Sequence, residues 1–259
     1  MSGLHGKTLV VTGAGAGIGQ GSALFFAREG ALVCCVDRDG GAAERTARLI
    51  GKNGGRALAA PVDITSEDDL RTMVDKVMSV SGRIDGLFAN AGIFKPGGAI
   101  GLPLEEWNEV IGVNLTGVFL TVREVLPVMV RQGSGSIVTL ASVAGMIGHR
   151  KSAAYAASKG GVIALTRQLA ADHARTGIRI NAVCPGTVRT ALAESAYARA
   201  GAPAADAELM FERVGERYPA GRLGEVNDVA ALVSFLLGDG SRWITGAAYP
   251  VDGGLTACY

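Results

Sequence analysis

The sequence of 259 residues has few aromatic side chains and almost no net charge. Aromatic residues make up 5% of the chain, and 25 Lys and Arg against 24 Asp and Glu leave a net charge of +1. Without a basic excess, the chain has no electrostatic reason to take nucleic acid or an anionic membrane as its main partner. Hydrophobic residues still make up 48% of the chain, a globular composition that excludes disordered, collagen-like and coiled-coil classes.

Cysteine and histidine are also scarce, and their spacing suits neither a disulfide framework nor a metal. Cys34 and Cys35 are adjacent in an apolar run, while Cys184 and Cys258 stand alone, so no C-x-x-C spacing occurs. The three histidines form no cluster with suitably spaced carboxylates. The sequence therefore predicts no metal site, and reduced thiols in a cytoplasmic protein.

The uncharged stretch between Lys7 and Arg28 contains no long apolar run. Its 20 residues include five glycines, which interrupt the hydrophobic segments. A membrane helix needs about 20 apolar residues and a secretory signal about 7–15. Neither is predicted here.

Glycine, in contrast, is abundant, with 38 residues or about twice its usual share of ~7%. Short β-branched runs alternate with longer helical patterns along the whole chain. The predicted strands lie at 8–12, 31–36, 57–61, 84–89, 136–141, 178–183 and 247–251, and the helices at 17–29, 41–53, 67–81, 105–131, 152–175 and 225–237.

Strands separated by helices pair in parallel through right-handed crossovers. The expected fold is therefore α/β, with a doubly wound parallel sheet of about seven strands and helices on both faces. No repeat or linker divides the pattern, so we expect one domain over residues 1–259. Residues 187–224 stand outside the alternation, and a stretch of that length predicts a lid over a substrate.

The loop after the first strand reads Thr12-Gly13-Ala14-Gly15-Ala16-Gly17-Ile18-Gly19. Glycine lets the backbone turn sharply and leaves the amides of the next helix open to a phosphate. The general G-x-G-x-x-G pattern does not fit, because Ile18 or Gln20 stands at its third glycine, and no Lys follows as in a Walker loop. By itself the loop leaves a purely structural turn as the alternative.

Asp37 ends the second predicted strand, 24 residues after Gly13. In a doubly wound fold, this position puts the carboxylate beside the adenosine ribose, where it accepts hydrogen bonds from the hydroxyls. The same charge repels the extra phosphate of NADP, although the adjacent Arg38 can offset that repulsion. NAD is therefore favoured over NADP, with an aspartate that only caps a loop as the structural alternative.

Tyr155 and Lys159 are four residues apart in a predicted helix and share one of its faces. A free phenol with a pKa near 10 is a poor base at neutral pH. A nearby ammonium favours the phenolate, and lowering the pKa by about 3 units corresponds to ~4 kcal/mol. Such a tyrosine can exchange a proton with an alcohol or ketone, but a Y-x-x-x-K pair alone also arises by chance.

Joined to the glycine loop, this pair makes the chain resemble the short-chain dehydrogenase/reductase family. The resemblance covers essentially the whole chain and implies a Rossmann-like fold and an NAD-dependent oxidoreductase that interconverts a secondary alcohol and a ketone. The other motifs that match in order and spacing are Asn90-Ala91-Gly92, Asn114, Ser142, Pro185-Gly186 and Val251-Asp252-Gly253-Gly254.

The resemblance also implies roles for four polar residues. Tyr155 is the expected general acid/base, and Lys159 holds the nicotinamide ribose and keeps Tyr155 acidic. Ser142 hydrogen-bonds the substrate oxygen. Asn114 kinks its helix and fixes a water that links Lys159 to solvent, with simple capping of the kink as its structural alternative.

The cofactor contacts follow from the same resemblance. Asp63 is expected at the adenine, and the residues after the sixth strand at the nicotinamide. The full expected set is Gly13, Ala16, Gly17, Ile18, Gly19, Asp37, Arg38, Asp63, Ile64, Asn90, Ala91, Gly92, Tyr155, Lys159, Pro185, Gly186, Val188 and Thr190.

Two rival functions stay open. One is an NADPH-dependent 3-oxoacyl-(acyl-carrier protein) reductase, against which Asp37 argues, and the other is a cofactor-binding scaffold without catalysis. The sequence does not identify the small-molecule alcohol or ketone. The run His149-Arg150-Lys151, between Ser142 and Tyr155, is expected to be a solvated cluster, with contact to an anionic substrate as the alternative.

The predicted helix 152–175 carries Ala and Gly on several of its faces. One face suffices to cover the sheet, so small residues elsewhere favour close packing against another subunit. Relatives of the resembled family are commonly tetramers through this helix and the one at 105–131. A homotetramer is therefore predicted, with no nucleic-acid or membrane partner.

Overall fold

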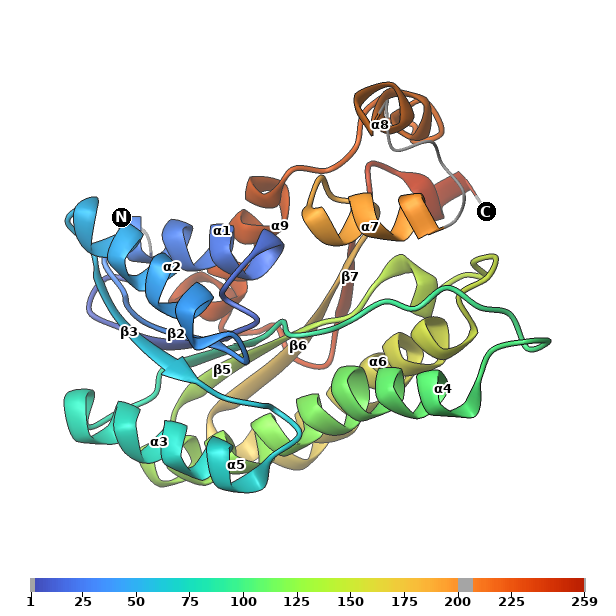
Figure 1. Cartoon of the computed structure of the whole chain (residues 1–259). Coiled ribbons are helices and arrows are strands. Elements are labelled where there is room, and N and C mark those ends of the chain that lie inside the picture. The colour runs from blue at the N-terminus through green and yellow to red at the C-terminus, as the bar shows by residue number, and fades with distance from the viewer. Residues whose placement is uncertain (1–2, 200–206, 259) are drawn as a thin grey trace.

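In the computed structural model, seven parallel strands form one sheet with helices on both of its faces (Figure 1). The structure describes residues 3–199 and 207–258. In the sheet the order is β3-β2-β1-β4-β5-β6-β7, so the chain reverses its direction of winding between β1 and β4, where such sheets bind ligands. The strands are β1 (Thr8–Thr12), β2 (Leu32–Asp37), β3 (Arg56–Pro61), β4 (Gly86–Ala89), β5 (Gly135–Leu140), β6 (Ile178–Pro185) and β7 (Ala248–Val251).

The helices form two layers, with α1, α2 and α9 on one face of the sheet and α3, α5 and α6 on the other (Figure 1). The predicted elements are confirmed, with ends shifted by at most two residues. The helices are α1 (Gly17–Arg28), α2 (Gly40–Lys52), α3 (Glu67–Ser81), α4 (Leu104–Ile111), α5 (Val118–Gln132), α6 (Ala153–His173), α7 (Ala191–Arg199), α8 (Ala207–Gly215) and α9 (Val226–Leu237).

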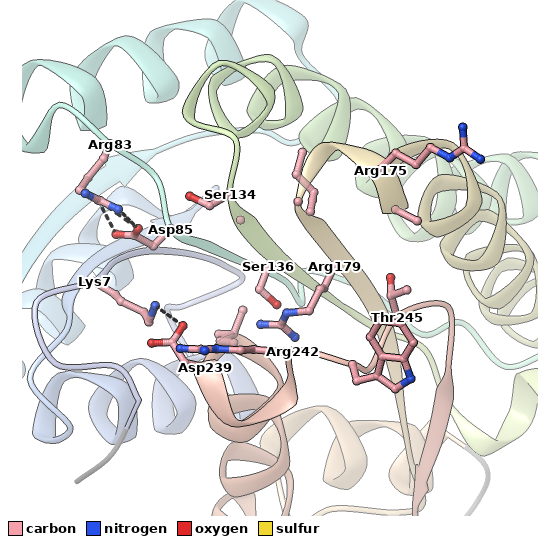
Figure 2. Close-up of a pocket in the computed structure, with 16 residues that line it drawn as sticks. Lys7, Arg83, Asp85, Ser134, Ser136, Arg175, Arg179, Asp239, Arg242 and Thr245 are labelled. Atoms are coloured by element: carbon pink, nitrogen blue, oxygen red, sulfur yellow. Dashed lines mark hydrogen bonds and ion pairs between the residues drawn. The ribbon is translucent and has the colours of Figure 1, made fainter.

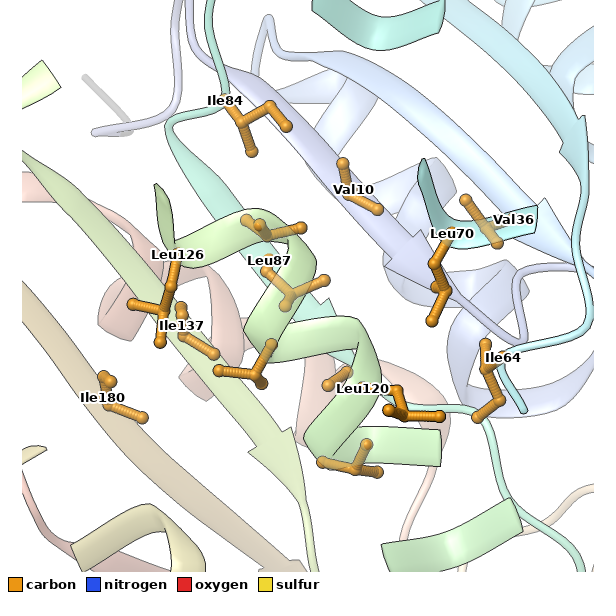
Figure 3. Packing of buried hydrophobic residues seen from close by; sticks show 14 of the residues in the cluster. Val10, Val36, Ile64, Leu70, Ile84, Leu87, Leu120, Leu126, Ile137 and Ile180 are labelled. Carbon is orange, nitrogen blue, oxygen red and sulfur yellow. The ribbon is translucent and has the colours of Figure 1, made fainter. Parts of the chain in front are cut away.

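Two hydrophobic cores lie on the two faces of the sheet because successive strand residues point in opposite directions. Val10 belongs to the cluster beneath α3, α5 and α6, whereas its neighbour Val11 belongs to the cluster beneath α1 and α9. Figure 3 shows the first of these cores, where Leu126 of α5 packs near Leu87 and Ile137 of the central strands. Both faces of the strands are buried, which explains their continuous apolar runs.

The helix predicted over 105–131 is present as one helical run, Leu104–Gln132, and its irregularity lies at Asn114, where a kink was expected. The chain forms α4, then a π-helical segment at Gly112–Gly117, then α5. A π-helix widens the turn by one residue, and such segments are frequent at functional sites. Asn114 is the buried polar residue within this segment.

The run Leu104–Gln132 is, within the described residues, the one stretch long and apolar enough to cross a membrane. In the fold, its side chains Val118, Val122, Val125 and Met129 are buried in the core beneath the sheet. The apolar character of this run is therefore accounted for by its packing against the sheet.

The segment at 187–224 contains α7 and α8 and has a small hydrophobic core of its own. This core consists of Phe211, Val214, Tyr218 and Leu223, and is distinct from the two cores of the sheet. Residues 200–206 lie outside the described residues. Figure 1 shows α7 and α8 together on the side of the sheet where α9 lies, near the end of the chain.

Candidate functional site

A cavity of about 300 Å³ opens at the carboxyl ends of β5 and β6. Ser142 and Tyr155 line it, and most of the remaining lining is apolar. The other lining residues are Ile18, Phe94, Pro96, Leu140, Ala141, Val143, Ala144, His149, Arg150, Lys151, Ser152, Pro185, Gly186, Thr187, Val188, Thr190, Leu192, Ala193, Tyr218 and Leu255. Open parallel sheets bind ligands at this edge.

Tyr155 lies in the first turn of α6 and presents its phenol to Ser142. The two hydroxyls are hydrogen-bonded, and the Tyr155 ring packs edge-on against Phe94 with 5.2 Å between ring centres. Burial raises the pKa of Tyr155, and the hydrogen bond with Ser142 opposes this rise. Ser142 is itself fixed, because its Oγ accepts a hydrogen bond of 3.2 Å from the Ala144 amide.

Lys159 lies one helical turn beyond Tyr155 and is 2% exposed. Its Nζ donates a hydrogen bond of 2.6 Å to the carbonyl of Leu140, at the end of β5. Burial lowers the pKa of this amine to about 8. The lysine thus stands behind the tyrosine, away from solvent, with its amine directed to the carboxyl end of the sheet.

Asn114 ties the π-helical segment to two other parts of the site. Its Oδ1 accepts a hydrogen bond of 2.8 Å from the Ile93 amide, and its Nδ2 donates to the Ile93 carbonyl at 2.9 Å. The same Nδ2 lies 3.2 Å from the Oγ of Ser158, the residue before Lys159. Asn114 therefore couples the loop after β4 to the helix that carries Tyr155 and Lys159.

The glycine loop is packed so closely that larger residues do not fit. A Cβ on Gly19 would lie 2.1 Å from the carbonyl oxygen of Gly13, which has a φ of +66°. Asn90 clamps the loop from below, with its Nδ2 donating to the carbonyls of Thr12 at 2.8 Å and Gly13 at 3.3 Å. This packing brings the backbone between β1 and α1 into one fixed turn.

The first turn of α1 is suited to an anion. Its N-cap residue Ala16 offers no side-chain acceptor, and the first turn contains no acidic residue. The amides at this helix end are therefore left for an external acceptor, in the positive field of the helix. A diphosphate group such as that of a dinucleotide fits this chemistry.

Asp37 lies directly beside the loop. Its Oδ2 accepts a hydrogen bond of 2.9 Å from the Gly15 amide, and its Oδ1 accepts one of 3.0 Å from the Asp39 amide. Asp63 lies at the end of the neighbouring strand, where its Oδ1 accepts bonds from the amide and hydroxyl of Thr65 at 2.9 and 2.7 Å. These bonds hold the pKa of Asp63 below its ordinary value.

The other predicted cofactor residues gather at the same edge of the sheet. Ile18, Pro185, Gly186, Val188 and Thr190 line the cavity itself. A Cβ on Gly17 would lie 3.3 Å from the Thr190 side chain, so the loop and the segment after β6 meet.

Ile64 differs from these residues, because its side chain is buried in the core and faces Gly117. Only its backbone is left to contact a ligand.

Tyr218 and Leu255 line the cavity but did not stand out in the sequence. The Tyr218 hydroxyl donates to Thr187 Oγ1 at 2.9 Å and accepts from the Thr187 amide at 2.8 Å. These bonds join the segment at 187–224 to the end of β6. An isolated tyrosine gives no local signal of a partner 31 residues away.

A second hollow, of about 620 Å³, lies at the opposite, amino ends of the strands (Figure 2). Most of its charged side chains have ion-pair or hydrogen-bond partners within the protein. Lys7 pairs with Asp239 at 3.1 Å, and the Arg83 Nε donates to Asp85 at 2.9 Å. The guanidinium of Arg179 donates to the carbonyls that end α9. These contacts hold the fold together, so the candidate site is the cavity at the carboxyl ends.

The sequence matches known proteins over nearly its whole length. The sequence model of the family described as enoyl-(acyl carrier protein) reductase matches residues 13–256. The chain is 39% identical over 255 residues to 2-(S)-hydroxypropyl-CoM dehydrogenase 3 of Xanthobacter autotrophicus, and the match covers 98% of each chain.

Solved structures of dehydrogenases and reductases have the same fold as this chain. Levodione reductase has a TM-score of 0.94 and 34% identity, covering 98% of this chain and 99% of that chain. A 3-ketoacyl-(acyl-carrier-protein) reductase from Brucella melitensis, complexed with NADH, has a TM-score of 0.86 and 36% identity, with coverage of 98% and 99%. The relatives are dehydrogenases and reductases, and one of them holds a nicotinamide cofactor.

Proposed function

Since the chain belongs to the short-chain dehydrogenase/reductase family, we propose that it transfers a hydride between a secondary alcohol and NAD, with Tyr155 as general acid/base. That it is an oxidoreductase interconverting an alcohol and a ketone with a nicotinamide cofactor follows from its relatives. The observation that carries the residue assignments is the meeting of Ser142 and Tyr155 in one apolar cavity, with Lys159 behind them.

Tyr155 and Ser142 act on one oxygen atom of the substrate. In the direction of oxidation, the Tyr155 phenolate takes the proton from the alcohol, and in reduction the phenol returns it to the ketone oxygen. Ser142 donates a hydrogen bond to the same oxygen and stabilises the charge that develops there. The bound cofactor supplies the acceptor or donor of the hydride.

Lys159 and Asn114 support this proton transfer from behind. The Lys159 ammonium lowers the pKa of Tyr155 electrostatically and holds the ribose hydroxyls of the cofactor. Asn114 holds α6 against the loop that follows β4, through its bonds to Ser158 and Ile93. It would also fix a water that relays protons from Lys159 to solvent.

The residues that would hold the dinucleotide lie at the carboxyl ends of the strands. The amides at the start of α1, with Gly13, Ala16, Gly17, Ile18 and Gly19, would hold its phosphates. The other contacts are those predicted from the sequence, namely Asp37, Arg38, Asp63, Ile64, Asn90, Ala91, Gly92, Pro185, Gly186, Val188 and Thr190.

NAD is the cofactor that Asp37 favours. Its carboxylate is at the end of β2, where the ribose hydroxyls can donate to it, and a phosphate on that ribose would meet its negative charge. For NADP to bind, the positive charge of Arg38 would have to offset the repulsion between Asp37 and the ribose phosphate. The lid over the substrate would be formed by the described parts of the segment, 187–199 and 207–224, which supply Leu192 and Tyr218 to the lining of the cavity.

Initial rates on a panel of secondary alcohols, followed by the absorbance of the reduced cofactor, test this proposal. We expect turnover with NAD, lower kcat/KM with NADP, and loss of turnover in Tyr155→Phe. Turnover of a 3-oxoacyl thioester with NADPH in preference to every alcohol would favour the reductase alternative. Cofactor binding without turnover of any substrate would indicate a scaffold.

We further propose that the protein is a cytoplasmic homotetramer. On the outer faces of α5 and α6, the exposed residues include Phe119, Val130, Ala157 and Ala164, which are apolar or small enough for close helix packing. The four cysteines are free thiols, as suits the cytoplasm. Light scattering coupled to size exclusion at micromolar concentration should give four times the mass of the chain, and a monomer would refute the assembly.

A further inference from the structure

We propose that the substrate of this dehydrogenase carries an anionic group, which Arg150 and Lys151 hold at the rim of the cavity. The inference rests on the proposed function, because it concerns the alcohol that Tyr155 deprotonates. The chemistry that Arg150 and Lys151 would recognise is a small oxyanion, of which a carboxylate is the simplest.

The charge around the cavity is of one sign. Arg150 and Lys151 line it together with His149, and within the described residues its lining contains no Asp or Glu. Any anionic group on a bound substrate therefore meets cations and no like charge. A cavity with low-dielectric walls strengthens such an interaction relative to open solvent.

Neither cation is already used by the protein. In the part of the chain that the structure describes, the side chains of Arg150 and Lys151 have no hydrogen bond and no ion pair. The two charges at the rim are thus left for a ligand.

The loop that carries these residues is fixed by hydrogen bonds. The His149 Nδ1 lies 2.8 Å from Ser152 Oγ, which donates to the Arg150 carbonyl at 3.2 Å. The Lys151 carbonyl accepts a bond of 2.9 Å from the Gly97 amide. Ser152 is 1% exposed, so the centre of this network is shielded from water. These bonds fix the loop backbone, so the two cationic side chains start from defined positions beside the cavity.

Lys151 has a backbone conformation that lysine rarely adopts. Its φ is +54°, and within the described residues it is the one non-glycine residue with positive φ. Such a conformation persists only where the surroundings enforce it, here through the bond to Gly97, and it occurs most often at functional sites.

The layout of the cavity gives the substrate class. Ser142 and Tyr155 would fix the reacting oxygen, apolar residues such as Phe94 and Leu192 line the same cavity, and the exposed cations Arg150 and Lys151 complete its lining. The matching molecule is a hydroxy acid or keto acid with a short apolar body between its reacting carbon and its carboxylate.

The test compares hydroxy acids with their methyl esters, which differ in charge and little in shape. Two pairs are 3-hydroxybutyrate and cis-4-hydroxycyclohexanecarboxylate, each against its methyl ester, with NAD as oxidant. We expect kcat/KM for at least one acid to exceed that for its ester about tenfold or more. Salt should reduce the ratio, because it screens exposed charges.

The variant Arg150→Gln/Lys151→Gln should lower the acid-to-ester ratio at least tenfold, mainly through the KM of the acid. Arg150→Gln alone keeps the Lys151 backbone unchanged and should lower the ratio in the same direction if the double variant does not fold. Arg131→Gln, at the exposed end of α5, is the matched control and should leave the ratio unchanged.

An ester used as well as its acid, with a ratio that the double variant does not change, would overturn the inference and leave the proposed function intact. Turnover of neutral alcohols such as cyclohexanol, with none for any acid, would overturn it as well. If neither acids, esters nor neutral alcohols are oxidised, it is the proposed function that fails, and the inference with it.

Discussion

The Nζ atom of Lys159 lies 5.7 Å from the centre of the Tyr155 ring. The two residues are one turn apart on α6, and the same Nζ is anchored to the Leu140 carbonyl. At this distance the ammonium favours the phenolate form of Tyr155, whereas burial of the phenol favours the neutral form. Burial therefore disfavours the charged forms of both neighbours, the Tyr155 phenolate and the Lys159 ammonium.

Tyr155→Phe should lower kcat for alcohol oxidation by at least about 10²-fold, because the variant keeps the ring but has no group to take the proton. The contact of the ring with Phe94 is retained and one hydroxyl is lost, so the affinity for NADH should fall far less than kcat. Steady-state rates and a fluorescence titration with NADH measure the two quantities. Tyr249→Phe on β7 is the matched control and should keep full activity. Undiminished turnover in Tyr155→Phe would remove Tyr155 from the proton transfer.

Lys159→Met should abolish activity. In the cofactor-free protein it should also change how the free energy of unfolding depends on pH. Burial lowers the pKa of Lys159 from 10.5 to about 8, so between these pH values the unfolded state binds more protons than the native state. The contribution of Lys159 to the free energy of unfolding should therefore rise with pH across this window, by about 3 kcal/mol in all. The buried thiols of Cys34, Cys35 and Cys184, whose pKa burial raises, act in the opposite sense in wild type and variant alike. Urea denaturation of both proteins at pH 7.5 and pH 10 isolates the lysine contribution as the difference between their changes.

Lys76→Met is the control for this comparison. Lys76 also donates to a backbone carbonyl, that of Ala59 at 2.8 Å, but its side chain is at the surface. This variant should keep the wild-type pH profile. Parallel profiles for the wild type and Lys159→Met would mean that the amine is not held as a costly buried cation.

The sheet and its helices could be predicted because the pattern that encodes them is local. Val10 and Val11 belong to opposite cores, and a strand buried on both faces reads as a continuous apolar run. Ser66 caps α3 through a hydrogen bond from the Asp69 amide at 3.3 Å, and both residues lie within four positions of sequence. Strands and helix caps depend on residues that are close in sequence, so the sequence pattern predicts them.

The features that escaped prediction depend on contacts between distant segments. The π-helical turn at Asn114 is held by bonds to Ile93 and Ser158, which helical periodicity does not register. The position of the His149-Arg150-Lys151 run beside the cavity follows from its place between Ser142 and Tyr155 in the sequence. The bond that holds the Lys151 backbone, from Gly97, spans 54 residues and leaves no local signal.

Asp37→Asn should narrow the preference for NAD over NADP by about tenfold or more. Asparagine keeps an oxygen that can accept the Gly15 amide but removes the charge that repels a ribose phosphate. A tenfold change in kcat/KM ratio corresponds to about 1.4 kcal/mol, a modest value for the loss of one nearby like charge. Asp75→Asn, on the exposed face of α3, is the control. An unchanged ratio would refute the ribose contact.

Gly19→Ala should weaken NAD binding at least tenfold and destabilise the fold, because its Cβ would lie 2.1 Å from the Gly13 carbonyl and 2.5 Å from Asn90 Nδ2. The loop must open to accept the methyl group, which moves the amides that face the phosphates, and overpacking of this kind costs about 1–3 kcal/mol. Gly51→Ala, in the exposed last turn of α2 with no atom within 4 Å of the new Cβ, makes the same chemical change. It should instead stabilise the protein by about 0.5–1 kcal/mol, as alanine does in a helix.

Calorimetric titration measures the affinity for NAD, and urea denaturation measures the free energy of unfolding. A Gly19→Ala protein that binds NAD with wild-type affinity would show that the cofactor does not need the close packing of the loop.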